Sequence, residues 1–197
     1  MKKNKPSPNE LSFWGHFDEL RVRLLRSTLV VFVLIVAGFF VAEPILKFLL
    51  KPYGSQINVI DLTEPIAIYF RVALTLGVAV ASPYLFYEAL AFFLPALGRH
   101  EKRWLFSVIP GAALLFGLGV LFAWVVLIPA AIQYLASFAT QVFKVEWTAS
   151  NYIPFVLSLV FWIGVTFELP LIIFFLAWLD LVTPSQLWQN WRLAVVG

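Results

Sequence analysis

The feature that most constrains this chain is a run of 40 residues, from Trp104 to Phe143, without a single Asp, Glu, Lys or Arg. A bilayer core about 30 Å thick is crossed by about 20 consecutive apolar residues in a helix. As one straight helix, the run would extend about 60 Å. We therefore expect a membrane span that tilts, projects beyond the bilayer, or breaks at Pro110 or Pro129.

Three shorter runs repeat this pattern, namely Ser27 to Ala42, Val72 to Tyr87 and Trp147 to Phe167. Only 13% of the residues are charged and 61% are hydrophobic, whereas a soluble domain carries about 25% charged residues. The sequence therefore predicts an all-α polytopic membrane protein, with residues 1–197 as a single membrane domain and spans at about 24–42, 70–97, 104–140 and 151–180. Prolines inside the spans predict bent helices in a concave bundle; they are Pro83, Pro110, Pro129, Pro154 and Pro170.

The basic residues predict the orientation, because Lys and Arg gather on the cytoplasmic side of a membrane. If the N-terminus is inside, ten of the 14 fall on inner segments: Lys2, Lys3, Lys5, Arg21, Arg23, Arg26, Arg99, Lys102, Arg103 and Arg192. The outer segments then hold Lys47, Lys51, Arg71 and Lys144. We expect a cytoplasmic N-terminus and a multi-pass protein of the bacterial cytoplasmic membrane. The net charge of +3 is explained by this rule and does not indicate nucleic-acid binding.

Both ends of the chain need separate interpretations. Residues 12–23 alternate apolar and charged side chains at helical spacing, which predicts a helix in the headgroup region before the first span. A cleaved signal peptide is the alternative, but the apolar run is long and acidic residues interrupt its leader. Residues 186–197 begin like a fifth helix and are too few to cross a membrane. We therefore expect a C-terminally truncated protein.

Signatures of catalysis and metal binding are missing from the sequence. It has no cysteine, no Walker loop, no H-E-x-x-H and no G-x-S-x-G, and its two histidines, His16 and His100, lie far apart. We therefore expect no enzymatic activity, no metal and no cofactor.

Four glutamates lie in unusual places for a membrane chain. Glu168 lies inside the fourth span, where a carboxylate costs at least ~2.5 kcal/mol, so it needs a protonated, hydrated or paired state. Glu88 lies near the inner end of the second span, where a structural role and a functional role are both open. Glu19 and Glu101 lie in basic inner segments. They can neutralise neighbouring cations, such as Arg23 for Glu19, or they can face a cationic ligand together.

Three sequence blocks match a known family. FWGHFDELRVRL at residues 13–24 resembles the H-x-x-E-L-R-x-R-L opening of the TatC family, the receptor subunit of the twin-arginine protein translocase. FFLPALGRHEKR at 92–103 is similar to that family's F-x-x-P-A-L-x-x-H-E-R/K-R, and FELP at 167–170 is similar to its F-E-x-P. The blocks cover the chain in order from about residue 12. One departure is that the family has six spans and this chain ends where the fifth begins.

The resemblance implies export of folded proteins whose signal peptides carry paired arginines, driven by the proton-motive force. It implies that Glu19 and Glu101 bind the arginines, and that Arg21, Phe92 and Pro95 shape the site. It further implies that Pro52 in the first outer segment is needed for activity, and that Glu168 docks single-span partners of the TatA/TatB type within the bilayer. Homo-oligomerisation in the receptor complex is also expected.

Two other functions remain open from the residues alone. Broken helices and an embedded Glu168 also suit a small secondary transporter, although the two halves of the chain show no internal repeat. An assembly scaffold without a ligand of its own is the third possibility, and it predicts that Glu19 and Glu101 are dispensable.

Overall fold

The computed structural model describes residues 8–52, 57–93, 101–138 and 147–178, and these are almost entirely helical. The elements are α1 (Pro8–Leu49), α2 (Glu64–Phe93), α3 (Glu101–Phe122), the π-helical turn η1 (Ala123–Leu127), α4 (Ile128–Ser137) and α5 (Ala149–Trp178). A single bridge between Asn58 and Thr148 is the one β interaction within these ranges. The segment expected to begin a fifth helix, 186–197, lies outside the described residues.

Four stretches are long and apolar enough to cross a membrane: Phe17–Leu49, Glu64–Phe92, Val108–Ser137 and Ala149–Phe175. In the most apolar window of the first stretch only 11% of the residues are buried within the protein. A helix that is apolar on all sides and so little covered requires lipid around it. The predicted all-α, polytopic membrane class is therefore confirmed.

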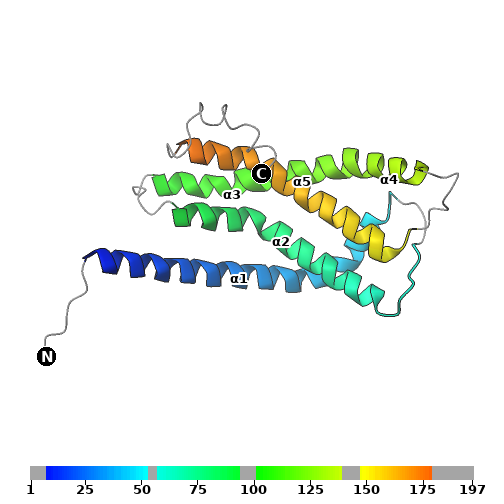
Figure 1. Ribbon diagram of the computed structural model, residues 1–197, viewed down its shortest axis with the longest axis horizontal. Helices are drawn as coiled ribbons and strands as arrows, with labels where there is room; N and C mark the ends of the chain where they lie inside the picture. Colours follow the sequence, from blue (N-terminus) through cyan, green and yellow to red (C-terminus); the bar gives the residue numbers. More distant parts are fainter. Residues whose placement is uncertain (1–7, 53–56, 94–100, 139–146, 179–197) are drawn as a thin grey trace.

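The helices run along the long axis of the molecule and meet at two ends (Figure 1). The start of α1, the end of α2, the start of α3 and the end of α5 gather at one end, which we name the Arg23 end. The other end, which we name the cap end, gathers the end of α1, the start of α2, α4 and the start of α5. Residues 12–23 and the first predicted span belong to the single helix α1.

The long apolar run changes its helical geometry immediately before Pro129. The turn η1 has π-helical hydrogen bonding at residues 123–127, and α4 follows with Pro129 in its first turn. Proline lacks an N–H group, and its ring collides with the carbonyl four residues earlier in an α-helix. A wider π turn relieves this conflict, so the run continues as one helical stretch, Val108–Ser137, with a change of geometry at Pro129 and no break there. Pro110 lies inside α3, which continues past it.

Small residues allow α1 and α2 to approach closely. On α2, Ala73, Gly77 and Ala81 recur every four residues and are all buried. They face α1, where a methyl group added to Gly38 would lie 2.9 Å from the carbonyl oxygen of Ala73. Such stripes of small residues bring backbones together and increase dispersion contacts between membrane helices. We name this contact the α1–α2 seam.

A second close contact joins α3 to α5. A methyl group added to Gly119 would lie 2.9 Å from the Cα atom of Gly164, and one added to Gly164 would overlap the ring of Phe116. Glycine is therefore required on both helices at this crossing. Together with the α1–α2 seam, this contact fixes the relative positions of the helices.

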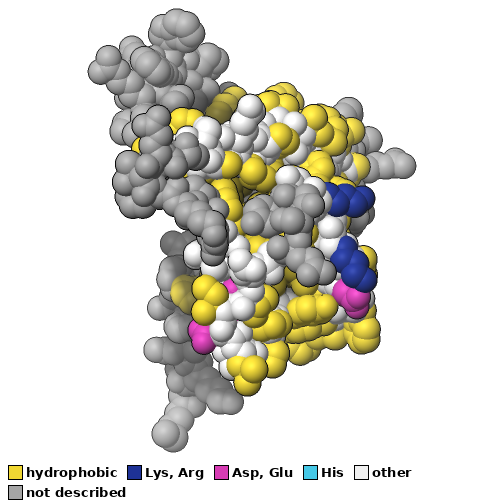
Figure 2. All heavy atoms as spheres, turned by 90° about the vertical axis from the view of Figure 1, so that its right-hand side faces the viewer, with side chains coloured by type: hydrophobic (Ala, Val, Ile, Leu, Met, Phe, Trp, Pro, Cys, Tyr) yellow, Lys and Arg dark blue, Asp and Glu magenta, His cyan; other side chains and the backbone are white. Residues whose placement is uncertain are grey.

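The larger hydrophobic core lies toward the cap end. It contains Ala42, Leu49, Ile68, Val72, Ile128, Ala149, Tyr152, Ile153, Val156 and Leu157. The smaller core, toward the Arg23 end, contains Leu90, Val108 and Phe175. Figure 2 looks onto the cap end, where charged side chains are sparse among hydrophobic and uncharged ones. The larger of the two cores thus lies at the cap end, and the smaller one lies at the Arg23 end.

Candidate functional site

The site at the Arg23 end is built around a guanidinium shared between two carboxylates. Nε and Nη2 of Arg23 both donate to Oε1 of Glu19, at 3.1 and 2.7 Å. Nη1 of Arg23 donates to Oε2 of Glu88 at 2.7 Å. Since Glu19 and Arg23 belong to α1 and Glu88 to α2, the guanidinium ties the two helices together.

Helical spacing explains the contact of Arg23 with Glu19, and burial of the Glu88 carboxylate explains the contact with Glu88. Glu19 and Arg23 are four residues apart, which brings their side chains together on one helix face. Glu88 is only 8% exposed and also accepts a hydrogen bond of 2.7 Å from the Tyr84 hydroxyl, one turn earlier on α2. A buried carboxylate needs such partners because it has lost its water. Arg23 and Tyr84 together supply them.

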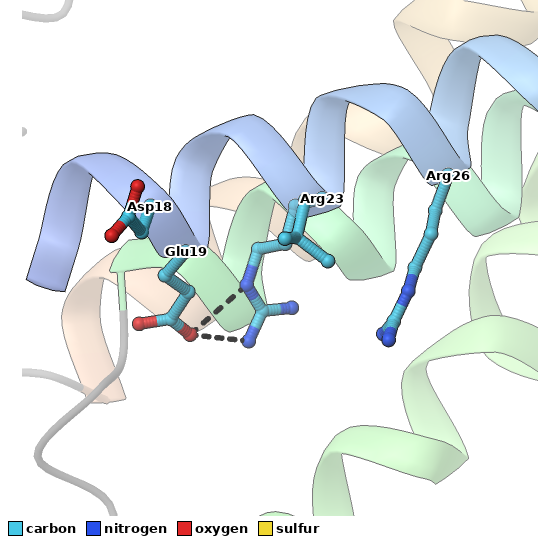
Figure 3. Close-up of a pocket in the computed structure, with 5 residues that line it drawn as sticks. Asp18, Glu19, Arg23 and Arg26 are labelled. Carbon is cyan, nitrogen blue, oxygen red and sulfur yellow. Dashed lines mark hydrogen bonds and ion pairs between the residues drawn. The ribbon is translucent and has the colours of Figure 1, made fainter.

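A pocket of about 370 Å³ opens beside this network. Its lining residues are Asp18, Glu19, Val22, Arg23 and Arg26. Figure 3 shows that the side chains of Glu19 and Arg23 meet on one side of α1, and that Arg26 extends from the next turn. The pocket therefore offers carboxylates and guanidinium groups at a surface, which suits a charged ligand that binds through hydrogen bonds.

Of the other residues predicted for ligand binding, Arg21, Phe92 and Glu101 belong to helices that meet at the same end. Arg21 is exposed on α1, and Phe92 is half-buried near the end of α2. Glu101 is the first residue of α3, which starts at the Arg23 end (Figure 1). Its side chain and the whole of Pro95 lie outside the part of the chain that the structure describes in this detail.

Glu168 lies in the second half of α5 and is buried, with 5% of its surface exposed. The Ser82 hydroxyl on α2 donates a hydrogen bond of 3.2 Å to Oε1 of Glu168. The embedded carboxyl is therefore satisfied by another helix of the same chain, one of the states expected from its position. Its role in partner docking stays a prediction.

Pro52, the other residue predicted to be functional, is half-buried just after α1 in the cap. The cap is organised by Glu64, whose carboxylate accepts hydrogen bonds from the backbone N–H groups of Ile60, Asp61 and Ser150. Ser150 lies in the first turn of α5, where N–H groups have no partners within the helix. Glu64 thereby joins the loop before α2 to the start of α5.

Sequence reasoning gave Glu88 no definite partner and did not place Tyr84 in the site. The Glu19–Arg23 pair was expected from spacing and is confirmed. Arg23 and Glu88 are 65 residues apart in the sequence and lie on different helices, so the periodicity of one helix does not reveal their contact. The one available signal was a carboxylate inside an apolar span, which requires a compensating cation or donor.

Among the described residues, no group of three or more His, Cys, Asp or Glu side chains is arranged to hold a metal ion. The groups present at the site are carboxylates, guanidinium groups and a phenol, which contact one another through hydrogen bonds and charge pairing. Such a set recognises a charged group by its geometry.

Comparison with known proteins gives consistent matches. A family model described as "Sec-independent protein translocase protein (TatC)" matches residues 15–197. The chain is 35% identical over 194 residues to the Synechocystis protein TatC, covering 98% of this chain and 76% of that protein. It is 33% identical to the chloroplast TATC protein of Oryza sativa over 98% of this chain, but spans only 54% of that longer protein.

A second bacterial relative and a solved structure are also similar to this chain. TatC of Listeria innocua is 36% identical over 180 residues, covering 89% of this chain and 72% of that protein. A crystal structure of the twin-arginine translocase receptor TatC in DDM superposes with a TM-score of 0.81 at 32% identity. This match covers 92% of this chain and 84% of that one.

These matches favour a protein translocase component over the small secondary transporter, because the matching proteins are translocase components and not solute carriers or enzymes. The four apolar spans and the bacterial relatives make the chain a multi-pass protein of the bacterial cytoplasmic membrane. The family model covers nearly the whole chain, and so do several relatives at more than 30% identity. The chain belongs to the TatC family of Sec-independent protein translocase components.

Proposed function

We propose that this chain binds twin-arginine signal peptides at its Arg23 end, which faces the cytoplasm, and acts in the export of folded proteins. Glu19 and Glu101 accept the two peptide arginines, with Arg21, Phe92 and Pro95 around them. Single-span partners of the TatA/TatB type and the proton-motive force complete the translocase, in which several copies of the chain assemble.

One observation carries this proposal: Glu19 already holds a guanidinium. Two N–H groups of Arg23 converge on one oxygen of Glu19 beside an open pocket. This geometry supports Glu19 as an acceptor for arginine, whose planar group donates in a fixed fork that lysine does not have. The helix α3 begins at Glu101 at the same end of the molecule, which supports Glu101 as a second acceptor.

The energetics suit selective binding of an exported peptide. A hydrogen bond to a charged group contributes about 1.5 to 3 kcal/mol. Two arginines that each gain such bonds give a clear preference over neutral side chains, and the apolar part of a signal peptide adds burial in the bilayer. We expect Glu101→Ala to weaken peptide binding and export, most strongly for peptides in which one arginine is already replaced.

Site-specific photo-crosslinking tests the proposal. A photoreactive residue in place of Asp18, which lines the pocket, should crosslink to a twin-arginine peptide and much less to a twin-lysine control. Glu19→Gln and Glu101→Gln should each reduce the crosslink. Equal crosslinking in all of these variants would reject the proposed site and favour a scaffold without a ligand of its own.

We also propose that Glu168 takes part in partner docking within the membrane. The Ser82 hydroxyl now occupies one oxygen of the carboxyl in a buried position. A polar group on a partner helix can bind there by replacing Ser82, which conserves the number of hydrogen bonds. Co-purification of a single-span partner with the wild type and with Glu168→Ala tests this role, and equal recovery would reject it.

A further inference from the structure

The contacts of Arg23 suggest how the site distinguishes arginine from lysine. We infer that Arg23 is an internal substitute for a signal-peptide arginine: it contacts Glu19 until a peptide arginine displaces it, and Glu88 then retains it. This inference rests on the proposed function of Glu19 and adds a specificity-determining residue to it.

The first support is that Arg23 makes two separable sets of contacts. Nε and Nη2 bind Glu19, whereas Nη1 binds Glu88 on the other helix. The Glu88 oxygen is 2.7 Å from Nη1, and Tyr84 fixes the second oxygen of that carboxylate at 2.7 Å. The Glu19 contacts can therefore be given up while the Glu88 contact persists.

The second support is the difference in exposure between the two carboxylates. The Glu19 side chain is 37% exposed and lines the pocket, but the Glu88 side chain is 10% exposed. An incoming cation therefore reaches Glu19 and not Glu88. Since Arg23 keeps a carboxylate partner on the buried side, its charge does not become unpaired when it leaves Glu19.

Competition with a guanidinium provides the selectivity. To displace Arg23, an incoming group must replace two N–H donors that come from different nitrogens of one planar group. A peptide guanidinium presents the same fork, whereas the N–H groups of an ammonium diverge from a single nitrogen. A peptide lysine therefore leaves Arg23 in place and gains less from Glu19. Discrimination against lysine comes from the displaced side chain as well as from the receiving carboxylate.

Four variants test the inference through the dissociation constants of a synthetic twin-arginine signal peptide and its twin-lysine counterpart. In Arg23→Lys the internal competitor loses its fork, so we expect the preference for arginine to fall about tenfold, or about 1.4 kcal/mol. In Arg23→Gln both peptides should bind more tightly, and the lysine peptide should gain more. Glu88→Gln should weaken both about tenfold, because Arg23 then has only Glu19, and should have no effect when Arg23→Gln is also present.

Arg71→Gln is the matched control. Arg71 is exposed near the start of α2, at the cap end, and does not line the pocket. Its removal lowers the net charge of the chain by the same amount as Arg23→Gln, so it should leave both dissociation constants and the preference unchanged.

The outcomes separate this inference from the proposed function. If Glu19→Gln leaves the binding of both peptides unchanged, the proposed site itself is wrong. If Glu19→Gln abolishes binding but Arg23→Lys keeps the wild-type preference, the proposed function stands and the role of Arg23 is wrong. Weaker binding of both peptides to Arg23→Gln, with Arg23→Lys again unchanged in preference, would also overturn the inference, because Arg23 would then only position Glu19.

Discussion

A single methyl group at Gly77 should loosen the α1–α2 seam that holds the two halves of the Arg23 network together. The Cβ atom of Gly77→Ala would lie 2.5 Å from Cγ1 of Ile35, 2.7 Å from its backbone N and 2.8 Å from its Cα. A change of rotamer moves only the first of these atoms. The helices must therefore separate until the gaps approach the 3.4 Å of ordinary contact.

The expected cost follows from this geometry. Overpacking of a fitted interface costs about 1 to 3 kcal/mol. Separation also weakens the neighbouring contact of Gly38 with Ala73, because dispersion falls steeply with distance. The higher helix propensity of alanine stabilises the variant by less than about 1 kcal/mol, which offsets part of this cost. We expect Gly77→Ala to be less stable than wild type by about 1 to 2 kcal/mol.

Gly117→Ala is the control, because a methyl group there meets nothing within 4 Å. Unfolding by titration with a denaturing detergent, followed through the fluorescence of the eight tryptophans, gives the stability of both variants. The chain has no cysteine, so an introduced cysteine pair across the seam reports helix separation without background. Equal stability and equal crosslinking of Gly77→Ala and Gly117→Ala would refute the reasoning.

Three further substitutions test the polar contacts. Ser82→Ala removes the donor to Glu168 and should cost about 0.6 to 1.7 kcal/mol in the same unfolding assay, the range of hydrogen bonds between membrane helices. Tyr152→Phe removes the hydroxyl that donates to the Leu49 carbonyl at the end of α1, and should cost about 1 to 3 kcal/mol by leaving a buried acceptor unpaired. Glu64→Gln should lower the midpoint of thermal unfolding, because a neutral amide replaces the carboxylate that accepts three backbone N–H groups.

Each of these has a control in the same chain. Glu43→Gln breaks an exposed pair with Lys47 on α1 and should leave the unfolding midpoint nearly unchanged, because exposed ion pairs contribute little. A drop as large as that of Glu64→Gln would mean that net charge, and not the cap, sets the midpoint. Thr166→Ala removes an exposed hydroxyl from α5 and is the comparison for Ser82→Ala and Tyr152→Phe. If Thr166→Ala lowers the stability as much as Ser82→Ala and Tyr152→Phe do, the two buried hydrogen bonds contribute no more than an exposed one.

The sequence by itself determined the membrane class and the helical content. Long runs without charge permit few structures in a bilayer, because the protein itself must hydrogen-bond every backbone group there, and apolar runs of this length do so as helices. Proline chemistry likewise limited any distortion of the long helical run to a few positions, and the structure has its π turn just before Pro129. Three motif blocks identified the family, since they join residue types and spacing that composition does not specify.

Only the tertiary structure decided which groups meet. The small residues Ala73, Gly77 and Ala81 are visible in the sequence at a spacing of four, but their partner is set by how α1 lies against α2. The partners of Glu88 and Glu168 are likewise on other helices, with Arg23 and Ser82 supplied across the bundle. Periodicity in the sequence indicates which face of one helix is buried, whereas a contact between two helices depends on the position and rotation of both. For this reason the sequence could pair Glu19 with Arg23 on one helix, whereas only the fold showed that Glu88 on α2 shares the same guanidinium.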